Sequence, residues 1–217
     1  MTSSDVPPGM RPRVTFDPGS MPRRAFYRVV NSVVVPRPIA WVCSRSAEGS
    51  PNLAPHSFFT VACVDPPIVQ FTSVGRKDSL NNVEATGDFT VNLTPEELFE
   101  QVNLTATDFP PHVNEADYCG VRLEPSDVVR SARVADSPVA IECELHSTLR
   151  LGDSTVVFGR VVHISAWESV VRDGRPRIEH LRPLARLGGN EWSTIGEVKQ
   201  IARIPYRDLE QDGTAGG

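Results

Sequence analysis

The chain has 217 residues, and at roughly 150 residues per domain this predicts one large domain with an appendage rather than two full domains. Charged residues make up 23% and hydrophobic residues 40%, close to the averages of soluble globular proteins, so the chain can bury a sizeable core. Asp and Glu (27) outnumber Lys and Arg (22), which gives a net charge of −5. This balance argues against nucleic acid or an anionic membrane as the main partner.

Cysteine spacing and the N-terminal composition bear on location. The four cysteines, at positions 43, 63, 119 and 143, form no CxxC pair and have no histidine at zinc-ligand spacing, so we expect reduced thiols and no metal site. Residues 1–24 are rich in proline and lack an apolar run of signal-peptide length. No window reaches the roughly 18 consecutive apolar residues of a membrane span. We therefore expect a cytoplasmic protein with a flexible N-terminal arm.

Valine-rich segments follow this arm. Residues 27–35 and 39–43 are strand-like, and Pro36-Arg37-Pro38 between them predicts a bend, because proline cannot donate a ladder hydrogen bond. A second β run covers residues 52–64, and a third strand is expected over residues 68–73. Joined by short turns, these strands predict an antiparallel meander.

Two short helices are predicted beside the next strand. Asp78 or Ser79 can cap a helix that ends near Gly87, where a left-handed residue is expected. A strand over residues 89–93 follows, and Thr94 then caps the second helix, whose first residue is a proline.

The second half of the chain contains a long excursion and a long hairpin. Residues 105–137 are rich in Pro, Asp and Asn and predict an excursion with one helical turn; such excursions are commonly lids or partner contacts. Strands over residues 139–151 and 155–167 are joined at Gly152-Asp153. A short helix is then expected over residues 179–187.

The predicted fold class is mainly β. At least six strands, mostly antiparallel, combine with two or three short helices, and no phosphate-binding glycine motif is present. We expect an antiparallel Greek-key or split barrel over residues 25–192, followed by a tail, 193–217, that packs on a neighbour up to Tyr206 and ends in disorder from 208. Such a barrel leaves strand edges that a homodimer commonly covers.

Two polar segments flank the predicted strand over residues 68–73. In residues 52–57 a proline breaks the ladder beside a hydroxyl and an imidazole, which suits a ring with polar and apolar edges; an ordinary bulge is the alternative. Residues 76–79 place two cations and a hydroxyl at a helix start, where phosphate would be stabilised; a solvated basic turn is the alternative. Both segments can lie at one end of one sheet, so their conjunction is more telling than either part.

A resemblance to a known family covers residues 25–192. The segments that carry it are residues 27–30, 33–42, 52–59, 65–67, 76–82, 86–92, 137–143, 158–164 and 181–189. In order and spacing they resemble the flavin reductase-like family of FMN-binding split barrels. Within that family, this chain is similar to the branch that ends in Val-Val-His-Ile and Arg-Leu-Gly-Gly. This branch contains nitrilotriacetate monooxygenase component B and flavoredoxin-like proteins.

The resemblance implies a homodimeric barrel that holds FMN in a groove near the subunit interface. No catalytic residue and no metal ligand is assigned. The implied cofactor contacts are Trp41 as a wall of the groove, Asn52, Ala54, Pro55, His56 and Ser57 along the ring and ribityl chain, Thr72 and Ser73 along the cofactor, and Arg76, Lys77 and Ser79 at the phosphate. For Trp41, a place in the core of the barrel is an equal alternative.

Ser154 departs from a pattern of two-component flavin reductases. These proteins often carry Gly-Asp-His before the last barrel strand, and the histidine meets the nicotinamide; here the triplet is Gly152-Asp153-Ser154. This departure argues against efficient use of NADH through this residue. Trp192 occupies a position where the branch often has an aromatic residue, which either covers the flavin or packs.

Three functions fit these observations. The first is an oxidoreductase that passes electrons from NADH or NADPH to flavin, with a monooxygenase or another flavin-accepting protein as partner. It needs no acid or base from the protein, since the flavin carries the hydride chemistry. The second is an FMN-binding electron carrier or flavin chaperone without a nicotinamide site. The third is an enzyme whose FMN acts on a small organic substrate admitted by the excursion. Ser154 favours the second and third somewhat.

Overall fold

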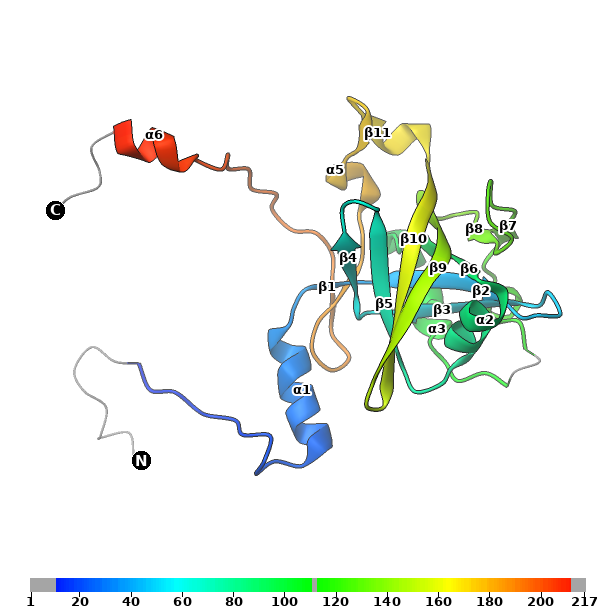
Figure 1. The fold of residues 1–217 in the computed structure, drawn as a ribbon, viewed down its shortest axis with the longest axis horizontal. Coiled ribbons are helices and arrows are strands. Elements are labelled where there is room, and N and C mark those ends of the chain that lie inside the picture. Colours follow the sequence, from blue (N-terminus) through cyan, green and yellow to red (C-terminus); the bar gives the residue numbers. More distant parts are fainter. Residues whose placement is uncertain (1–10, 111–112, 212–217) are drawn as a thin grey trace.

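The centre of the molecule is one antiparallel sheet that curls into a barrel (Figure 1). The computed structural model describes residues 11–110 and 113–211. The sheet has seven strands in the order β3-β2-β6-β9-β10-β5-β4. Their bounds are β2 Ala40–Arg45, β3 Pro51–His56, β4 Phe59–Cys63, β5 Ile68–Val74, β6 Asp88–Asn92, β9 Val139–Leu151 and β10 Ser154–Ala166. The predicted mainly β barrel with short peripheral helices is confirmed.

The barrel opens at the junction of its two end strands. β3 and β4 lie at opposite ends of the strand order, yet only Ser57 and Phe58 separate them in the chain. The curl brings β3 near β5, and the backbone N–H of Thr72 on β5 donates to the carbonyl of Phe58 at 2.9 Å. A short linker therefore spans the gap between the two edges of one sheet.

Alternating residues of β2 face two separate cores. Ala40 and Val42 pack inside the barrel with Phe71 and Phe89, whereas Trp41 and its neighbours of the same parity pack on the outer face. The side-chain period of two in a strand separates the two sets, and both are fully buried because a second layer covers the outside of the sheet.

The helix α2, Asp78–Thr86, plugs one end of the barrel with Leu80 and Val83, which are fully buried. Gly87 ends it in the left-handed conformation with φ of 77°, as predicted. The residue before its first turn is Lys77, not Asp78 or Ser79, and no side chain caps it. Ser79 is instead buried, and its hydroxyl contacts the buried side chains of Asn52 and His56.

The second predicted helix consists of a 3-10 turn, η1 Glu96–Leu98, and the helix α3, Phe99–Leu104. The expectation that Thr94 caps it and that proline is its first residue is wrong. Pro95 instead precedes the first turn in an extended conformation, and Thr94 is buried. The carbonyl of Thr94 accepts from Leu184, and Pro95 forms a bridge with Pro183, so tertiary pairing sets where the helix begins.

The segment predicted as a strand over residues 27–35 is a helix, α1, Arg23–Val33. In a helix the backbone hydrogen bonds are satisfied within the segment, with no need of a neighbouring strand. Arg37 also donates to the carbonyls of Asn31 and Val34 at 2.7 Å each, which satisfies groups that the helix end leaves free. These tertiary contacts outweigh the β propensity of valine.

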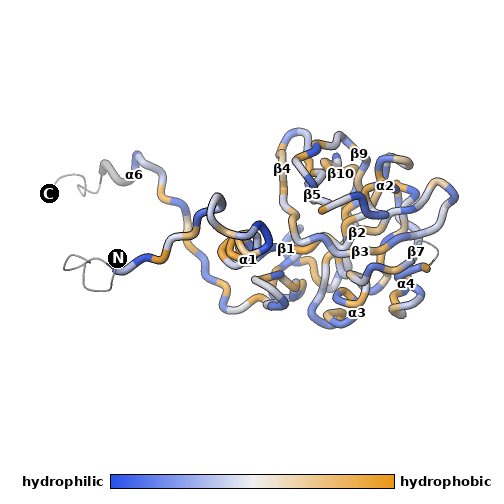
Figure 2. The backbone as a smooth tube through the Cα atoms, turned by 90° about the horizontal axis from the view of Figure 1, so that it is seen from below, coloured by the Kyte–Doolittle hydropathy of each residue, from blue (hydrophilic) through white to orange (hydrophobic). Residues whose placement is uncertain are grey.

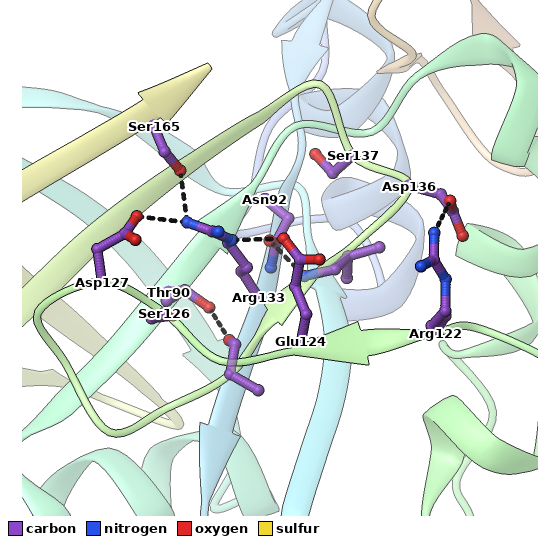
Figure 3. A network of polar contacts seen from close by, with 12 residues as sticks. Thr90, Asn92, Arg122, Glu124, Ser126, Asp127, Arg133, Asp136, Ser137 and Ser165 are labelled. Carbon is purple, nitrogen blue, oxygen red and sulfur yellow. Dashed lines mark hydrogen bonds and ion pairs between the residues drawn. The ribbon is translucent and has the colours of Figure 1, made fainter. Parts of the chain in front are cut away.

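The excursion covers the outer face of β2, β3 and β6. It contains the predicted helical turn, α4 Glu115–Tyr118, and two short paired strands, β7 Leu123–Glu124 and β8 Arg133–Val134. Polar contacts hold its return: Asn92 accepts from the N–H of Val134 at 2.9 Å, and Arg133 lies between Asp127, Glu124 and Ser165 (Figure 3). The returning part of the excursion is thereby held against the barrel.

The C-terminal part adds small elements and then leaves the barrel (Figure 1). These are η2 Glu168–Val170, β11 Val171–Arg172, β12 Arg175–Pro176, α5 Ile178–Leu181, β13 Ala185–Arg186 and β14 Trp192–Ser193; β13 pairs with both β14 and β1, Arg37–Pro38. The helix predicted over residues 179–187 is shorter because Arg182 is left-handed, with φ of 42°, and Pro183 follows.

The tail contains a helix, α6, Tyr206–Gln211, within the segment for which disorder from Asp208 is predicted; residues 212–217 lie outside the described part. Figure 2 shows α1 between the barrel and the two terminal segments, with apolar and polar residues mixed along all three. Within residues 11–110 and 113–211, no helix is both long and apolar enough to cross a bilayer.

Candidate functional site

A cleft of about 420 Å³ opens where the barrel is split. Its walls come from β3, the end of β5, the start of α2 and the first residues of the excursion. Eight of the eleven predicted contact residues line it, namely Asn52, Ala54, Pro55, His56, Ser57, Thr72, Lys77 and Ser79. The two polar segments singled out in the sequence therefore face one space.

The other three predicted contacts do not line the cleft. Trp41 is fully buried in the outer core, and its indole N–H donates to Thr105 Oγ1 at 2.9 Å. Ser73 is buried on the opposite side of β5 from Thr72, and Arg76 pairs outward with Glu84 at 2.6 Å. Trp41 touches the cleft only through Thr105, which does line it. Its indole is thus part of the core, the alternative left open from the sequence.

Buried polar groups form the floor of the cleft. The hydroxyl of Ser79 accepts from Asn52 Nδ2 at 3.2 Å and lies 3.1 Å from His56 Nε2. The His56 ring packs against Phe71 at 4.7 Å between ring centroids. Burial lowers the pKa of His56 to about 4, so its imidazole is neutral near pH 7. The floor is hydrogen-bonded and carries no charge at that pH.

Charge is concentrated at the α2 end of the cleft. Lys77 Nζ contacts Asp108 Oδ1 at 2.9 Å, and this hydrogen bond lowers the pKa of Asp108. Asp78 and Glu115 line the same space. Glu115 is buried, which raises its pKa, and it accepts from the N–H of Leu53 at 3.3 Å. Lys77 thus has a carboxylate where an external anion would bind.

Sequence reasoning missed several residues of the cleft. Tyr27 and Phe58 meet edge to face at 6.5 Å and form one wall, and residues 105–109 form another. The composition of the excursion was the available signal for the second wall. Tyr27 could not be found, since its segment was assigned to a strand.

Ser154 lies next to the cleft, in a cavity of about 950 Å³ beneath α1. Tyr27, Phe58 and Val74 line both spaces. The Ser154 hydroxyl donates to Asp153 Oδ1 at 3.0 Å. Trp192, by contrast, does not line the cleft: it packs between Phe99 and Arg186.

A cluster of Asp127, Glu142 and His163 has its ligand-type atoms within 4.8 Å of one another. Both oxygens of Glu142 accept backbone N–H groups, from residues 127–129, at 2.7 to 2.9 Å. Asp127 pairs with Arg133. These contacts engage the carboxylates, so the cluster fastens the excursion to β9 and β10.

The groups that line the cleft fit FMN. Pro55, Phe58 and Phe109 offer apolar surfaces for a flat ring, the hydroxyls of Ser57 and Thr72 offer hydrogen bonds, and one lysine offers a positive charge. A volume of about 420 Å³ lies in the range of roughly 300–1,000 Å³ common for cofactor and ligand pockets.

Comparisons with known proteins agree with this geometry. An uncharacterized protein of Halalkalibacterium halodurans is 35% identical over 200 residues, covering 87% of this chain and 95% of that protein. Nitrilotriacetate monooxygenase component B of Bacillus cereus is similar in structure, with a TM-score of 0.85 and 27% identity over 88% of this chain and all of that one. The 2-nitrobenzoate 2-nitroreductase of Pseudomonas fluorescens has a TM-score of 0.82 and 29% identity over 88% and 96%.

Two more distant structures share the fold. Flavoredoxin of Desulfovibrio vulgaris has a TM-score of 0.73 at 20% identity over 78% of this chain and 92% of that one. A flavin reductase with a split barrel domain from Shewanella frigidimarina has a TM-score of 0.76 at 19% identity over 87% and 95%. The expected split barrel and the resemblance to this branch are confirmed. Because the flavin reductase like domain matches residues 32–179, the chain belongs to that family of flavin-related oxidoreductases.

Proposed function

We propose that the protein is an FMN-binding oxidoreductase that passes electrons from NADH or NADPH to flavin. One observation carries the proposal: the split of the barrel brings together, in one cleft, a loop suited to a flat ring and a helix start suited to a phosphate. These parts, residues 52–57 and 77–79, flank β5, and Ser79 contacts both Asn52 and His56 across the floor of the cleft.

The residues of the cleft would hold FMN as follows. Tyr27 and Phe58 would flank the ring, Ser57 and Thr72 would bond the polar edges, and Lys77 would pair with the phosphate beside the first N–H groups of α2. When bound, FMN would supply the hydride-transfer chemistry between the nicotinamide and the electron acceptor. The chain's own task is to bind, orient and exclude water.

The second part of the proposal is a homodimer. In α1, Tyr27, Val30 and Val33 are 51%, 40% and 71% exposed, and the helix buries none of its residues. Ile201 in the tail is 95% exposed. A second copy of the chain is the partner that would cover an apolar helix face and an apolar tail in one step. We propose residues 25–192 as the folded unit, with the tail 193–217 on the second copy.

A partner protein and a location complete the proposal. The likeness to a monooxygenase component B supports a monooxygenase or another flavin acceptor as partner. Burial raises the pKa values of Cys43 and Cys143 to about 12, so these thiols stay protonated and unreactive, which is compatible with the cytoplasm that we propose.

A second candidate is an enzyme that uses bound FMN on a small organic substrate. The likeness to a 2-nitrobenzoate 2-nitroreductase favours it, and so does the wall that residues 105–109 add to the cleft. The electron-carrier alternative is supported only by Ser154, which has a hydroxyl where relatives that handle nicotinamide carry an imidazole.

Anaerobic mixing separates these functions. The purified protein with FMN is mixed with NADH or with NADPH, and the flavin absorbance band is followed in a stopped-flow instrument. We expect the band to bleach faster than with free FMN. If FMN binds but neither nucleotide bleaches it, the reductase assignment fails. The next assay would then mix the chemically reduced protein with a nitroaromatic oxidant.

A further inference from the structure

A second cavity, of about 420 Å³, lies beside the cleft and is lined by four arginines. They are Arg24 and Arg28 on α1, Arg37 on β1 and Arg186 on β13. Among the described residues that line this arginine cavity, none is Asp or Glu. For a chain with a net charge of −5, such a local excess of positive charge calls for a physical reason.

Arg37 is the innermost of the four, with 8% of its surface exposed. Its guanidinium donates to three backbone carbonyls, those of Asn31, Val34 and Leu187, at 2.7 Å each, and its Nε has no partner. Carbonyls satisfy the N–H groups but do not neutralise the charge. A buried charge without a counter-charge is costly, and a bound anion would remove that cost.

The other three arginines are not consumed by structure. Within the described part of the chain, no ion pair includes Arg24, Arg28 or Arg186. Arg186 stacks on Trp192 at 4.5 Å and donates once, to the carbonyl of Gly189 at 2.9 Å. Burial and the charge of Arg37 lower its pKa, which means that the cavity holds unrelieved repulsion.

Helix geometry directs two of these side chains to the same place. Arg24, Arg28 and Asn31 are spaced by four and three residues, so they share one face of α1, and this face lines the cavity. Capping of the helix end explains Arg37 alone. It does not explain why Arg24 and Arg28, which form no ion pair within the described residues, converge on the same space as Arg186.

The arginine cavity shares a wall with the cleft. Tyr27, Ser57 and Phe58 line both, and these residues form the wall where a flavin ring is proposed to lie. A ligand with its anionic part among the arginines could therefore extend an uncharged ring to the flavin side of that wall. A nicotinamide dinucleotide has this form.

We propose that the arginine cavity binds the phosphates of the electron donor and selects NADPH over NADH. This inference rests on the proposed function. A phosphate monoester such as the 2′-phosphate of NADPH adds about 1.5 to 2 negative charges near pH 7. Guanidinium groups bind phosphate through paired hydrogen bonds, and arginine is the usual residue beside a 2′-phosphate. Four arginines match the more highly charged of the two donors.

Binding of the oxidised nucleotides tests the proposal without turnover. The full-length protein loaded with FMN is titrated calorimetrically with NADP⁺ and with NAD⁺, for the wild type and for the double variant Arg24→Ala/Arg28→Ala. Arg172→Ala is the matched control, since Arg172 is exposed and lines neither the cleft nor the arginine cavity. We expect at least tenfold tighter binding of NADP⁺ by the wild type and by the control, and loss of this preference in the double variant.

Several outcomes would overturn the proposal. Equal affinity of the wild type for both nucleotides would do so, as would a preference that survives the double variant. A double variant that becomes monomeric by sedimentation but keeps the preference would make the cavity a subunit interface instead. Competition by benzoate, without binding of NADP⁺, would assign it to a carboxylate substrate.

The test also separates this inference from the proposed function. FMN affinity is measured independently by flavin fluorescence, and the double variant should leave it within about twofold. If FMN does not bind at all, the proposed function fails; the cavity is then titrated with 2′,5′-ADP alone, which should still bind to the wild type at least tenfold more tightly than to the double variant. Equal binding of 2′,5′-ADP to both proteins would overturn the inference.

Discussion

At the scale of single residues, Lys77 and Asp108 set the electrostatics of the cleft. Their contact of 2.9 Å places a carboxylate of the chain on the cation that a phosphate would use. Both side chains are largely exposed, at 54% and 90%, so water screens the pair and exchange for a phosphate is cheap. In this pair the Asp108 carboxylate occupies the position that the phosphate of the ligand would take, and the pair adds little to the stability of the fold.

We predict that Lys77→Ala weakens FMN binding about tenfold and that Asp108→Asn tightens it by a few-fold. The first change removes a hydrogen bond to a charged group, worth roughly 1.5 kcal/mol at the exposed end of the range. The second removes the competing carboxylate. Fluorescence titration measures both. Riboflavin, which has no phosphate, is the control ligand, and an equal loss of its binding in Lys77→Ala would show that Lys77 does not contact phosphate.

His56 should make the stability of the protein depend on pH. Its folded pKa is about 4 against an ordinary value of 6.5, so between these values the unfolded chain binds a proton that the folded chain does not. The free energy of unfolding should therefore fall as the pH drops from 6.5 to 4, by roughly 3 kcal/mol from this group. Above pH 6.5 the contribution is constant.

Urea unfolding at several pH values checks this prediction. In His56→Gln the decrease between pH 6.5 and 4 should be smaller by that amount, whereas a His180→Gln control at an exposed position should follow the wild type. Parallel curves for the wild type and His56→Gln would contradict the assignment of the pH dependence to this buried ring.

At the scale of elements, the hairpin of β9 and β10 lies in the middle of the seven-stranded sheet, and its packing against the core depends on a glycine. The pairing of these strands shifts register next to Gly159, and the ring of Phe89 packs over that position. A Cβ there would lie 2.8 Å from Phe89 Cε1 and 3.0 Å from Cys143 Cβ. The strand can pass the core at this point only because the residue has no side chain.

Gly159→Ala should lower the free energy of unfolding by about 1–3 kcal/mol, the usual cost of overpacking a core. Gly196→Ala is the matched control, since a Cβ at Gly196 would have no neighbour within 4 Å. Thermal or urea unfolding of the two variants measures the difference. Equal stability of both would mean that Phe89 moves aside without cost.

At the scale of the whole molecule, the apolar face of α1 is the feature that one chain leaves incomplete. We predict that light scattering gives about twice the monomer mass of 23.8 kDa. Val33→Lys should reduce this mass to that of the monomer, because the lysine charge would be buried in the dimer interface. Val33 is 71% exposed in the single chain, so the substitution should leave the fold of the monomer intact. Val64→Lys, at a residue 88% exposed in a distant turn, should stay dimeric. A monomeric wild type at micromolar concentration would refute the homodimer.

The sequence by itself determined the barrel and most of the cleft. Period-two patterns, proline breaks and the left-handed Gly87 act locally, so β5, α2 and the long hairpin could be predicted close to their true bounds. The family resemblance implied the eight contact residues that line the cleft: seven lie in the two segments that flank β5, and Thr72 lies on β5 itself.

Only the tertiary structure decided the rest. Residues 23–33 form a helix whose end is closed by Arg37, which lies outside the segment and donates to the carbonyls of Asn31 and Val34. Trp41 went to the core rather than to the cleft because the excursion covers the outer face of β2. The arginine cavity arises from α1, β1 and β13 together. No local pattern encodes the meeting of Arg24 and Arg186, which lie 162 residues apart, since packing alone brings them to one space.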